Sequence, residues 1–434
     1  MNPFEFLKLL NNLDIEAYIV GGFVRDLCIG LTPHDADIEI YGISYENLLD
    51  KVSNLGKVSV VGKSFGVVKL TIGNQEFDLA LARTENRIGV THTDFEVSFD
   101  TNLRPEDASK RRDYTINAMM LDHNRVLYDF HNGQYHISQS LLHPVSEAFL
   151  QDPLRVLRGM QFASRYNMNA SNNMIAYGRM CADEYKNISI DRVRDEWLKW
   201  AKGMYPHKGI QFLDECRWLL NYEEIFDMKY IMQNPYYHAE GSVFKHTQLV
   251  LMHAGLQMNP IITFAALCHD MGKVKYTIIE NGVIKSPGHN DPTLAIQFCN
   301  SIGLPVEMTG RIACLVREHM FDINSITPRT IKRLLTRIVS NDFENLCQLM
   351  VSDRLGRIPK KDSEITQINE MRVIYRELGQ ENAVKPVIMG RHLIEKGFQP
   401  GPQFSIALRT AFEAQLDGNH SFEELLEIAL KNMT

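Results

Sequence analysis

The sequence predicts a protein of the α+β class, in which an N-terminal sheet domain is followed by all-helical domains. Two observations carry this prediction. Short β-branched runs separated by turn residues occupy residues 14–142, as expected of strands. After Pro144 the apolar residues recur with a period of about 3.6, which is typical of amphipathic helices. At about 150 residues per domain, the 434 residues suffice for roughly three domains.

Strands are expected wherever a β-branched or aromatic run is bounded by turn residues. These runs cover residues 17–20, 37–40, 66–70, 76–79 and 126–130. Helices are expected from Leu154 onward, with apolar faces around residues 197–198 and 212–213 and a strongly apolar segment at 261–268. Breaks near residues 232–238 and 357–361 suggest four domains, 1–143, 144–232, 233–360 and 361–434.

Composition and charge favour a folded protein from a reducing compartment. Hydrophobic residues make up 44% and charged residues 23%, which excludes a disordered or fibrous chain. Seven cysteines are scattered without a C-x-x-C pair, so free thiols are expected. The N-terminal residues lack leader features and no apolar run could span a bilayer, so we expect a cytoplasmic protein without a membrane partner. With a formal charge of −7, a nucleic acid would require a local basic stripe.

A glycine turn follows the first predicted strand. Gly21 and Gly22 open the next helix, whose free N–H groups and positive dipole end can receive a phosphate, and Arg25 can add a charged contact. An ordinary turn is the alternative explanation of the two glycines. The sequence that follows makes phosphate binding the better interpretation.

Acidic residues alternate along the second predicted strand. Asp35 and Asp37 should share one face, while Ile38 and Ile40 face the core. Paired carboxylates repel each other, and a bound divalent cation offsets this repulsion, so a metal site is expected here with Mg²⁺ as its ion. Asp78, in another predicted strand, can join the same cluster. A solvated strand face with capping acids is the alternative.

The motif Gly21-Gly22-x-Val24-Arg25-Asp26 followed by Asp35-x-Asp37 resembles the class II tRNA nucleotidyltransferases, that is, the CCA-adding enzymes and bacterial poly(A) polymerases. This resemblance implies a polymerase-β-like head, with Asp35, Asp37 and Asp78 as catalytic Mg²⁺ ligands beside a triphosphate. Residues 111–118 are similar to the family's ribose motif, which implies that Arg112 and Asp113 bind nucleotide. The resemblance also implies tRNA, CTP and ATP as partners.

Residues 152–158 look like the family's base-recognising helix, which implies nucleotide contacts from Asp152, Arg155 and Arg158. An Asp acceptor and an Arg donor can present the hydrogen-bonding edge of a pairing base. Surface ion pairs along the helix are the alternative. Two positions depart from the family pattern, since Gln151 replaces the usual Glu and Gln161 the usual Arg. A poly(A) polymerase or a partial, CC- or A-adding enzyme therefore stays open.

A second group of residues follows in the helical part. His269 and Asp270 end the apolar segment 261–268, and His246, His289, His319 and Asp353 accompany them in an order that resembles the HD phosphohydrolase superfamily. The resemblance implies that His246, His269, Asp270 and Asp353 bind a divalent transition metal such as Ni²⁺ or Mn²⁺, with His269 and Asp270 catalytic and with His289 and His319 near substrate phosphate or a second metal. Imidazole and carboxylate ligands suit these metals, whose open positions can activate water against a phosphoester.

The predicted function is Mg²⁺-dependent, template-free addition of CCA from CTP and ATP to tRNA 3′ ends. The second site predicts a phosphatase or 2′,3′-cyclic phosphodiesterase activity on RNA ends. A different class stays open as well, an HD phosphohydrolase whose head only binds nucleotide or RNA. Tyr236 and Tyr237 either stack bases or cover a core. No sequence feature indicates the oligomeric state.

Overall fold

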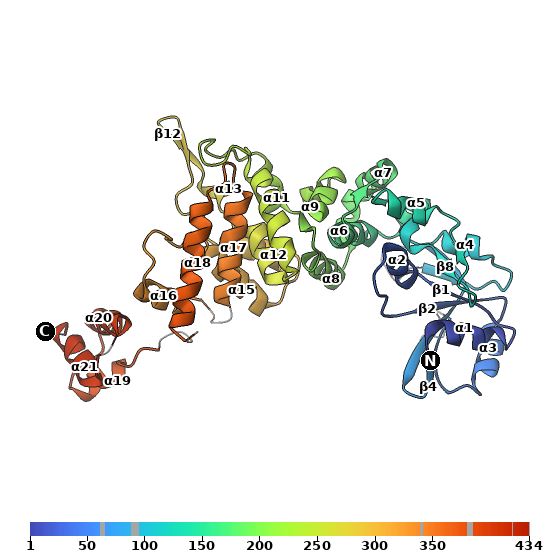
Figure 1. Ribbon diagram of the computed structural model, residues 1–434, viewed down its shortest axis with the longest axis horizontal. Coiled ribbons are helices and arrows are strands. Elements are labelled where there is room, and N and C mark those ends of the chain that lie inside the picture. Colours follow the sequence, from blue (N-terminus) through green and yellow to red (C-terminus); the bar gives the residue numbers. More distant parts are fainter. Residues whose placement is uncertain (61–65, 88–94, 339–341, 380–384, 419, 434) are drawn as a thin grey trace. The chain divides into compact units, whose positions relative to one another are not determined.

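The computed structural model describes residues 1–434 except 61–65, 88–94, 339–341, 380–384, 419 and 434 (Figure 1). The chain divides into two compact units, Met1–Glu223 and Glu224–Thr434, and each is described by itself. The first unit holds the main sheet and the second is almost entirely helical, which confirms the predicted α+β class. Among the described helices, none combines the length and the apolar character needed to cross a membrane.

A seven-stranded sheet forms the head of the first unit, in the order β3-β4-β5-β2-β1-β8-β9. Its strands are β1 (Glu16–Val20), β2 (Asp37–Tyr41), β3 (Lys57–Val60), β4 (Val67–Ile72), β5 (Gln75–Leu81), β8 (Met120–Leu121) and β9 (Leu127–Tyr128). β2 and β5 run parallel, and the other neighbouring pairs are antiparallel. All five expected strands therefore have a counterpart in the sheet.

The register of the central strands places two of the predicted acids side by side. Ile38 of β2 is aligned with Leu79 of β5, so Asp37 and Asp78, one residue earlier in each strand, are neighbours. Asp35 lies in the loop before β2 rather than on the strand as expected. The reason is that β1 ends at Val20, opposite Asp37, and the backbone turns away at the following residue.

Helices cover the sheet and continue the first unit. They are α1 (Pro3–Asn11), α2 (Gly22–Ile29), α3 (Tyr45–Val52), α4 (Pro105–Ser109), α5 (Gly133–Ser138), α6 (Leu154–Tyr166), α7 (Asn172–Met180), α8 (Ile190–Ala201) and α9 (Pro206–Glu215), with 3₁₀ turns η2 (Thr115–Asn117), η3 (Glu147–Gln151), η4 (Ala182–Asn187) and η5 (Trp218–Asn221). Two short strand pairs complete the unit, β6 (Thr84–Arg87) with β7 (Phe95–Ser98) and β10 (Leu141–Leu142) with β11 (Asn169–Ala170).

A glycine brings α6 close to the segment that resembles the ribose motif. A Cβ on Gly159 would lie 2.2 Å from the Tyr114 hydroxyl and 2.4 Å from a ring carbon of Phe212, so only glycine fits there. The same hydroxyl donates to the carbonyl of Arg155 at 2.8 Å. Segment 111–118 and α6, which carry the predicted nucleotide contacts, are thus packed directly against each other.

The second unit is a set of packed helices with one exposed hairpin. Its elements are α10 (Glu223–Phe226), η6 (Asp227–Lys229), α11 (Val243–Ala254), η7 (Gly255–Gln257), α12 (Pro260–Cys268), α13 (Lys273–Tyr276), β12 (Ile278–Glu280), β13 (Val283–Lys285), α14 (Thr293–Ser301), α15 (Val306–Glu318), α16 (Pro328–Leu335), α17 (Phe343–Gly356), α18 (Asp362–Glu377), α19 (Gly390–Glu395), α20 (Pro402–Asp417) and α21 (Phe422–Lys431). Helices α11, α12, α15 and α17 lie side by side (Figure 1). Helices α19–α21 share a small core of their own, which includes Leu393, Ala411 and Leu425.

Candidate functional site

A cleft of about 440 Å³ lies in the first unit, bounded by the glycine turn, segment 111–117 and helices α6 and α8. Its lining carries eight cationic side chains against three carboxylates. The cations are Arg25, Arg111, Arg112, Arg155, Arg158, Arg165, Arg192 and Lys199, and the acids are Asp37, Asp113 and Asp152. A cleft lined by one sign of charge concentrates ligands of the opposite sign. The cleft therefore favours polyanions although the whole chain is acidic.

The glycine turn forms one wall of this cleft. Gly21 has φ 73° and ψ −133°, a conformation that residues with a side chain rarely adopt. A Cβ at this position would also lie 3.3 Å from Nη1 of Arg112 and 3.7 Å from Oδ2 of Asp37. Helix α2 starts directly after the turn, and no side chain caps its first N–H groups. The predicted phosphate-receiving turn thus lies beside both a predicted cation and a predicted metal ligand.

Arg25 is buried below the turn, with 6% of its surface exposed. Its Nη1 donates to Oδ1 of Asn117 at 2.9 Å, and its Nε and Nη2 donate to Oδ1 of Asp26 at 2.8 and 2.7 Å. The guanidinium also faces the ring of Tyr166, 4.7 Å from the ring centre. Arg25 therefore connects α2, segment 111–117 and α6, besides lining the cleft.

The three predicted Mg²⁺ ligands lie close enough for their charges to interact, but they do not form a compact group of ligand atoms. Desolvation in the cleft raises the pKa of Asp37, Arg112 opposes this shift, and the charges of Asp78 and Asp35 add to it. Asp78 also forms an ion pair with Lys69 at 3.5 Å. Among the described residues, Asp35, Asp37 and Asp78 do not belong to any set of three potential metal ligands whose ligand atoms all lie within 4.8 Å of one another. Mutually repelling carboxylates at the edge of a basic cleft nevertheless fit a divalent cation, which would relieve the repulsion.

Glu39, which the sequence reasoning did not single out, is the buried acid of β2. Only 1% of it is exposed, and its oxygens pair with Nη2 of Arg111 at 2.5 Å and Nη2 of Arg112 at 2.9 Å. Burial opposes the charge, but Arg112 and Arg111 outweigh it and lower the pKa of Glu39 to about 2. The strict alternation of the strand was the available signal, because it places Glu39 on the same face as Asp37.

Three of the predicted nucleotide-binding residues, Asp113, Asp152 and Arg158, take part in two separate ion pairs. Asp113 accepts from Nε of Arg158 at 2.7 Å and from Nδ2 of Asn117 at 3.0 Å, and although burial opposes the charge, these partners lower the pKa of Asp113 to about 2. Asp152 pairs with Arg192 of α8 at 2.7 Å rather than with an arginine of its own helix. Both pairs join the α6 region to another element, so they are not the surface ion pairs along the helix that were the alternative explanation.

Arg155 has a different environment from Arg158. Its Nη1 donates to the carbonyl of Ala148 at 2.8 Å and its Nη2 to the carbonyl of Arg111 at 2.7 Å. These bonds hold the segments before α6 against the helix. Arg155 lines the cleft, but two of its donors already serve the protein backbone.

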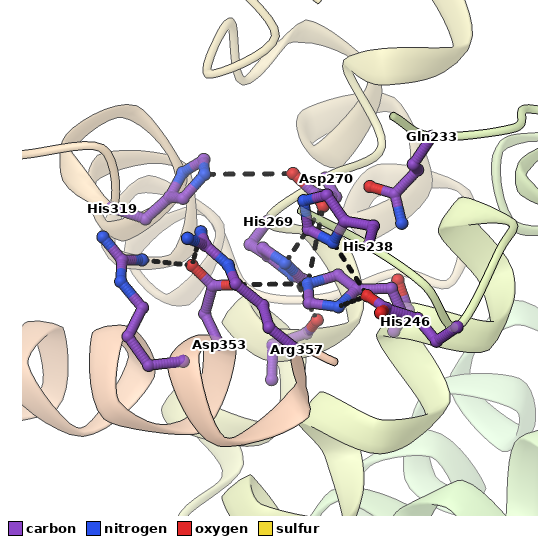
Figure 2. Close-up of polar contacts among 12 residues, drawn as sticks. Gln233, His238, His246, His269, Asp270, His319, Asp353 and Arg357 are labelled. Carbon is purple, nitrogen blue, oxygen red and sulfur yellow. Dashed lines mark hydrogen bonds and ion pairs between the residues drawn. The ribbon is translucent and has the colours of Figure 1, made fainter. Parts of the chain in front are cut away.

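In the second unit, the four predicted metal ligands converge from three helices (Figure 2). His246 lies in α11, His269 and Asp270 directly follow α12, and Asp353 lies in α17, each at most 2% exposed. Nε2 of His246 lies 3.1 Å from Oδ1 of Asp353 and 3.8 Å from Oδ2 of Asp270. Nε2 of His269 lies 3.3 Å from the same Asp270 oxygen. The ligand atoms of His246, His269 and Asp353 all lie within 4.8 Å of one another.

Three imidazoles of this site place their Nδ1 atom against a backbone carbonyl. Nδ1 of His269 faces the carbonyl of Ala266 at 2.8 Å, Nδ1 of His289 faces that of Ser286 at 2.7 Å, and Nδ1 of His319 faces that of Val316 at 2.6 Å. A carbonyl only accepts, so Nδ1 carries the proton and Nε2 keeps its lone pair. Nε2 of His289 and of His319 lie 3.5 and 3.9 Å from Oδ1 of Asp270. Asp270, His289 and His319 thus form a second compact group.

The charge states of the site suit a metal. Burial lowers the pKa of His319 to about 3, which keeps this ring neutral. Burial opposes the charge of Asp270, but the Lys273 ammonium 2.7 Å away outweighs it and holds the pKa of Asp270 well below its usual range. Arg357 and Arg354 do the same for Asp353. The buried Nε2 of His269 and Oδ2 of Asp270, 3.3 Å apart, are both acceptors when the proton is on Nδ1, so no hydrogen bond joins them, as expected of two atoms that can bind one metal.

Several supporting residues of this site were not predicted. Lys273 donates from Nζ to Oδ2 of Asp270 and to Oε1 of Gln233, both at 2.7 Å. Nδ1 of His246 lies 2.9 Å from Oε1 of Glu240, which orients the imidazole. The spacing of Lys273, three residues after Asp270 at a helix end, was the signal that could have identified it. A cavity of about 210 Å³ opens beside Asp270, His289 and His319.

Comparison with known proteins identifies relatives over most of the chain. Residues 17–143 match the family described as the poly A polymerase head domain. The chain is 31% identical over 381 residues to the multifunctional CCA protein of Vibrio vulnificus strain YJ016, covering 83% of this chain and 90% of the relative. It is 29% identical over 408 residues to the multifunctional CCA protein of Pasteurella multocida, covering 89% and 93%.

Solved structures share the fold of the whole chain. The Bacillus stearothermophilus CCA-adding enzyme in complex with CTP has a TM-score of 0.69 at 19% identity and covers 100% of this chain and 98% of its own. The Thermotoga maritima CCA-adding enzyme complexed with tRNA has a TM-score of 0.57 at 18% identity, with 100% and 97% covered. At these identities the likeness concerns the fold.

Proposed function

We propose that this chain, which belongs to the family of multifunctional CCA proteins, adds CCA to the 3′ ends of tRNA from CTP and ATP in the cleft of its first unit. The observation that carries this proposal is the basic cleft whose glycine turn lies beside Asp37. A nucleoside triphosphate supplies the negative charge that such a cleft attracts, and the free N–H groups of α2 can receive its phosphates. The chain is accordingly an enzyme of the nucleotidyltransferase class.

The acidic edge of the cleft serves the transfer step. Asp35, Asp37 and Asp78 would hold Mg²⁺, which when bound neutralises the triphosphate and lowers the pKa of the attacking 3′-hydroxyl. Arg112 faces both Asp37 and the glycine turn, so it can bind triphosphate oxygens next to the acids. Glu39 holds the guanidinium of Arg112 in place through their ion pair.

The two ion pairs on the α6 side of the cleft, Asp113–Arg158 and Asp152–Arg192, would select the nucleotide. Arg158, oriented by Asp113, offers donors to the base, and Asp152, oriented by Arg192, offers acceptors. Gln161 departs from the family pattern, but its Oε1 accepts from Nη1 of Arg165 at 3.2 Å, and both residues line the cleft. Arg165 therefore supplies a cation beside Gln161 in the cleft, which supports full CCA addition over partial addition.

We infer a second activity for the second unit, hydrolysis of phosphoesters at RNA ends with a divalent transition metal. His246, His269, Asp270 and Asp353 would hold the metal, for which their imidazole and carboxylate donors are suited and which, when bound, generates a nucleophilic water. His289 and His319 point their Nε2 atoms toward the same aspartate and can contact the substrate phosphate. Lys273 keeps Asp270 ionised and adds positive charge near that phosphate.

Assays on separate variants test both activities. Purified protein is incubated with tRNA lacking CCA, Mg²⁺, and CTP and ATP singly and together, and product length is read on a sequencing gel. Addition of three nucleotides supports CCA synthesis, a long adenosine tail supports a poly(A) polymerase, and no extension leaves a phosphohydrolase with a nucleotide-binding head. Asp35→Ala should abolish extension and spare hydrolysis, and His269→Ala should do the reverse. Loss of both activities in either folded variant would contradict two independent sites.

A further inference from the structure

Two aromatic side chains of α6 lie among the arginines of the basic cleft. Arg158, Phe162 and Tyr166 follow one another at intervals of four residues, so they share one face of the helix. The rings of Phe162 and Tyr166 are stacked, with their centres 6.1 Å apart and their planes at 27°. Phe162 is buried, and Tyr166 is half-buried at the end of the helix. The sequence reasoning singled out neither ring.

Each of these rings contacts two guanidinium groups. The Cζ atoms of Arg158 and Arg25 lie 5.4 and 5.3 Å from the centre of the Phe162 ring. The Cζ atoms of Arg25 and Arg165 lie 4.7 and 5.0 Å from the centre of the Tyr166 ring. A cation within about 6 Å of a ring centre is attracted by the negative face of the ring. Arginines and rings therefore alternate along this wall of the cleft, in the order Arg158, Phe162, Arg25, Tyr166 and Arg165.

An aromatic ring differs from a carboxylate as the partner of an arginine in the cleft. A carboxylate orients the guanidinium but also cancels its charge, as Asp113 does for Arg158 at 2.7 Å. A ring orients the guanidinium and leaves its full charge available to a ligand. The negative faces of the rings also offset part of the repulsion among cations in a cleft lined by eight of them.

Arg165 shows this difference most clearly. Its Nη1 donates to Oε1 of Gln161 at 3.2 Å, and its guanidinium contacts the Tyr166 ring. Both partners are uncharged, so they orient Arg165 without neutralising it. The side chain of Arg165 is exposed to solvent, and holding a long, exposed side chain in one conformation costs entropy. Without the ring, Gln161 would be its remaining hydrogen-bond partner among the described residues.

Arg25 connects the rings to the glycine turn. A Cβ on Gly22 would lie 3.4 Å from Nη2 of Arg25, so this guanidinium lies directly against the turn that is proposed to receive phosphate. The Tyr166 hydroxyl donates to Oδ1 of Asp26 at 3.3 Å, and the same oxygen accepts from Nη2 of Arg25 at 2.7 Å. Tyr166 therefore holds Arg25 both through its ring and through a shared acceptor.

We propose that Tyr166 is a positioning residue for nucleotide addition, because its ring holds Arg25 and Arg165 where the incoming nucleoside triphosphate binds. Tyr166 is not among the residues that line the cleft, whereas both arginines are, so it acts through them. The effect falls on the binding of the nucleotide, and thus on KM, rather than on the transfer step. This inference rests on the proposed function of the cleft in the first unit.

The test separates the electrostatics of the ring from its bulk. Tyr166→Phe is the reference, and the same full-length protein is prepared with one, two or three fluorine atoms on the phenylalanine ring at this position. Fluorine weakens the negative face of the ring and changes its size little, so the attraction of the cations falls stepwise. In addition to tRNA lacking CCA, KM for CTP and for ATP should rise along the series, by about 2- to 30-fold in all. The values of kcat and the thermal midpoint should change little.

Phe4→Leu is the matched control. The Cζ atom of Arg125 lies 4.6 Å from the centre of the Phe4 ring in the same unit, and neither residue lines the cleft. This variant should leave both KM values unchanged. Equal KM values across the fluorinated series would overturn the proposal, and so would a loss confined to kcat or to the thermal midpoint, since either would indicate a merely structural ring.

The failure of the proposed function is recognised separately. If wild-type protein adds no nucleotide to tRNA, that function fails, and calorimetric titration of the same series with CTP decides on Tyr166. A Kd for CTP that rises with each fluorine supports the positioning role. An unchanged Kd, or no binding of CTP at all, refutes it.

Discussion

Glu39→Gln is expected to destabilise the first unit through a single buried charge. Glu39 is 1% exposed and holds Arg111 and Arg112, whose side chains are 20% and 16% exposed. The amide keeps the shape of the side chain but removes the negative charge that faces both guanidinium groups. Breaking a buried pair in this way typically costs about 3–5 kcal/mol.

The pKa of Glu39 supplies an independent magnitude. A folded value of about 2, against 4.5 for the ordinary side chain, corresponds to about 3 kcal/mol of stability at pH 7. Because the folded pKa is the lower one, this stability is present above pH 4.5 and is lost as the pH falls toward about 2. At pH 3 less than half of it, about 1.4 kcal/mol, should be left.

The assay uses the tryptophan residues as reporters. Trp197, Trp200 and Trp218 are the three tryptophans of the chain, and all lie in the same compact unit as Glu39. Their fluorescence during heating should show a midpoint lowered by about 6–12 °C in Glu39→Gln at neutral pH, and by much less at pH 3. Asp107→Asn is the matched control, because Asp107 also pairs with two cations, Arg104 and Lys110, but at the surface.

The control should leave the midpoint nearly unchanged. The reasoning would be refuted if Glu39→Gln were as harmless as the control, or if the difference between Glu39→Gln and wild type did not shrink at acidic pH. Extension of tRNA should also fall in Glu39→Gln, since Arg112 loses the group that positions it beside the glycine turn.

Three further predictions concern the two sites. Gly21→Ala should reduce nucleotide addition and destabilise the first unit by about 1–3 kcal/mol, because φ is 73° there and a Cβ would crowd Arg112; normal activity in a gel extension assay would contradict this. Lys273→Met should lower phosphoester hydrolysis by about 10- to 100-fold without changing tRNA extension, because Asp270 loses the cation 2.7 Å away; a parallel loss of extension would contradict separate sites. After treatment with a chelator, addition of Ni²⁺ or Mn²⁺ should raise the thermal midpoint of wild-type protein in calorimetry. At a metal concentration one hundred times Kd, the stabilisation should be about 2.7 kcal/mol. His269→Ala should lose this shift.

The local parts of both sites were predictable from the sequence. The strands that carry Asp37 and Asp78 were expected from their β-branched runs, and the apolar helix before His269 from its composition. Alternation along a strand correctly placed Ile38 and Ile40 in the core. These features depend on periodicity and turn residues, which act over a few neighbouring positions.

Partners that come from distant elements were not predictable in the same way. Asp152, Arg155 and Arg158 were expected to address one pocket, and all three line the cleft, but their ion-pair partners were not foreseen. Asp152 pairs with Arg192, 40 residues away, and Arg158 pairs with Asp113. Asp35 was expected on the strand, but the ladder ends at Asp37 because β1 turns at Gly21. The exposure of Tyr236 and Tyr237 was equally open until the loop could be placed on its neighbours.

By itself, the sequence determined the α+β class, the order of the motifs and the residue types that each kind of chemistry requires. Only the tertiary structure decided which charges neutralise one another, as with Glu39 between Arg111 and Arg112, and which histidine nitrogens keep a lone pair. The physical reason is that the energy of a charge or a hydrogen bond depends on distance and burial in space, and these are set by how elements far apart along the chain pack together.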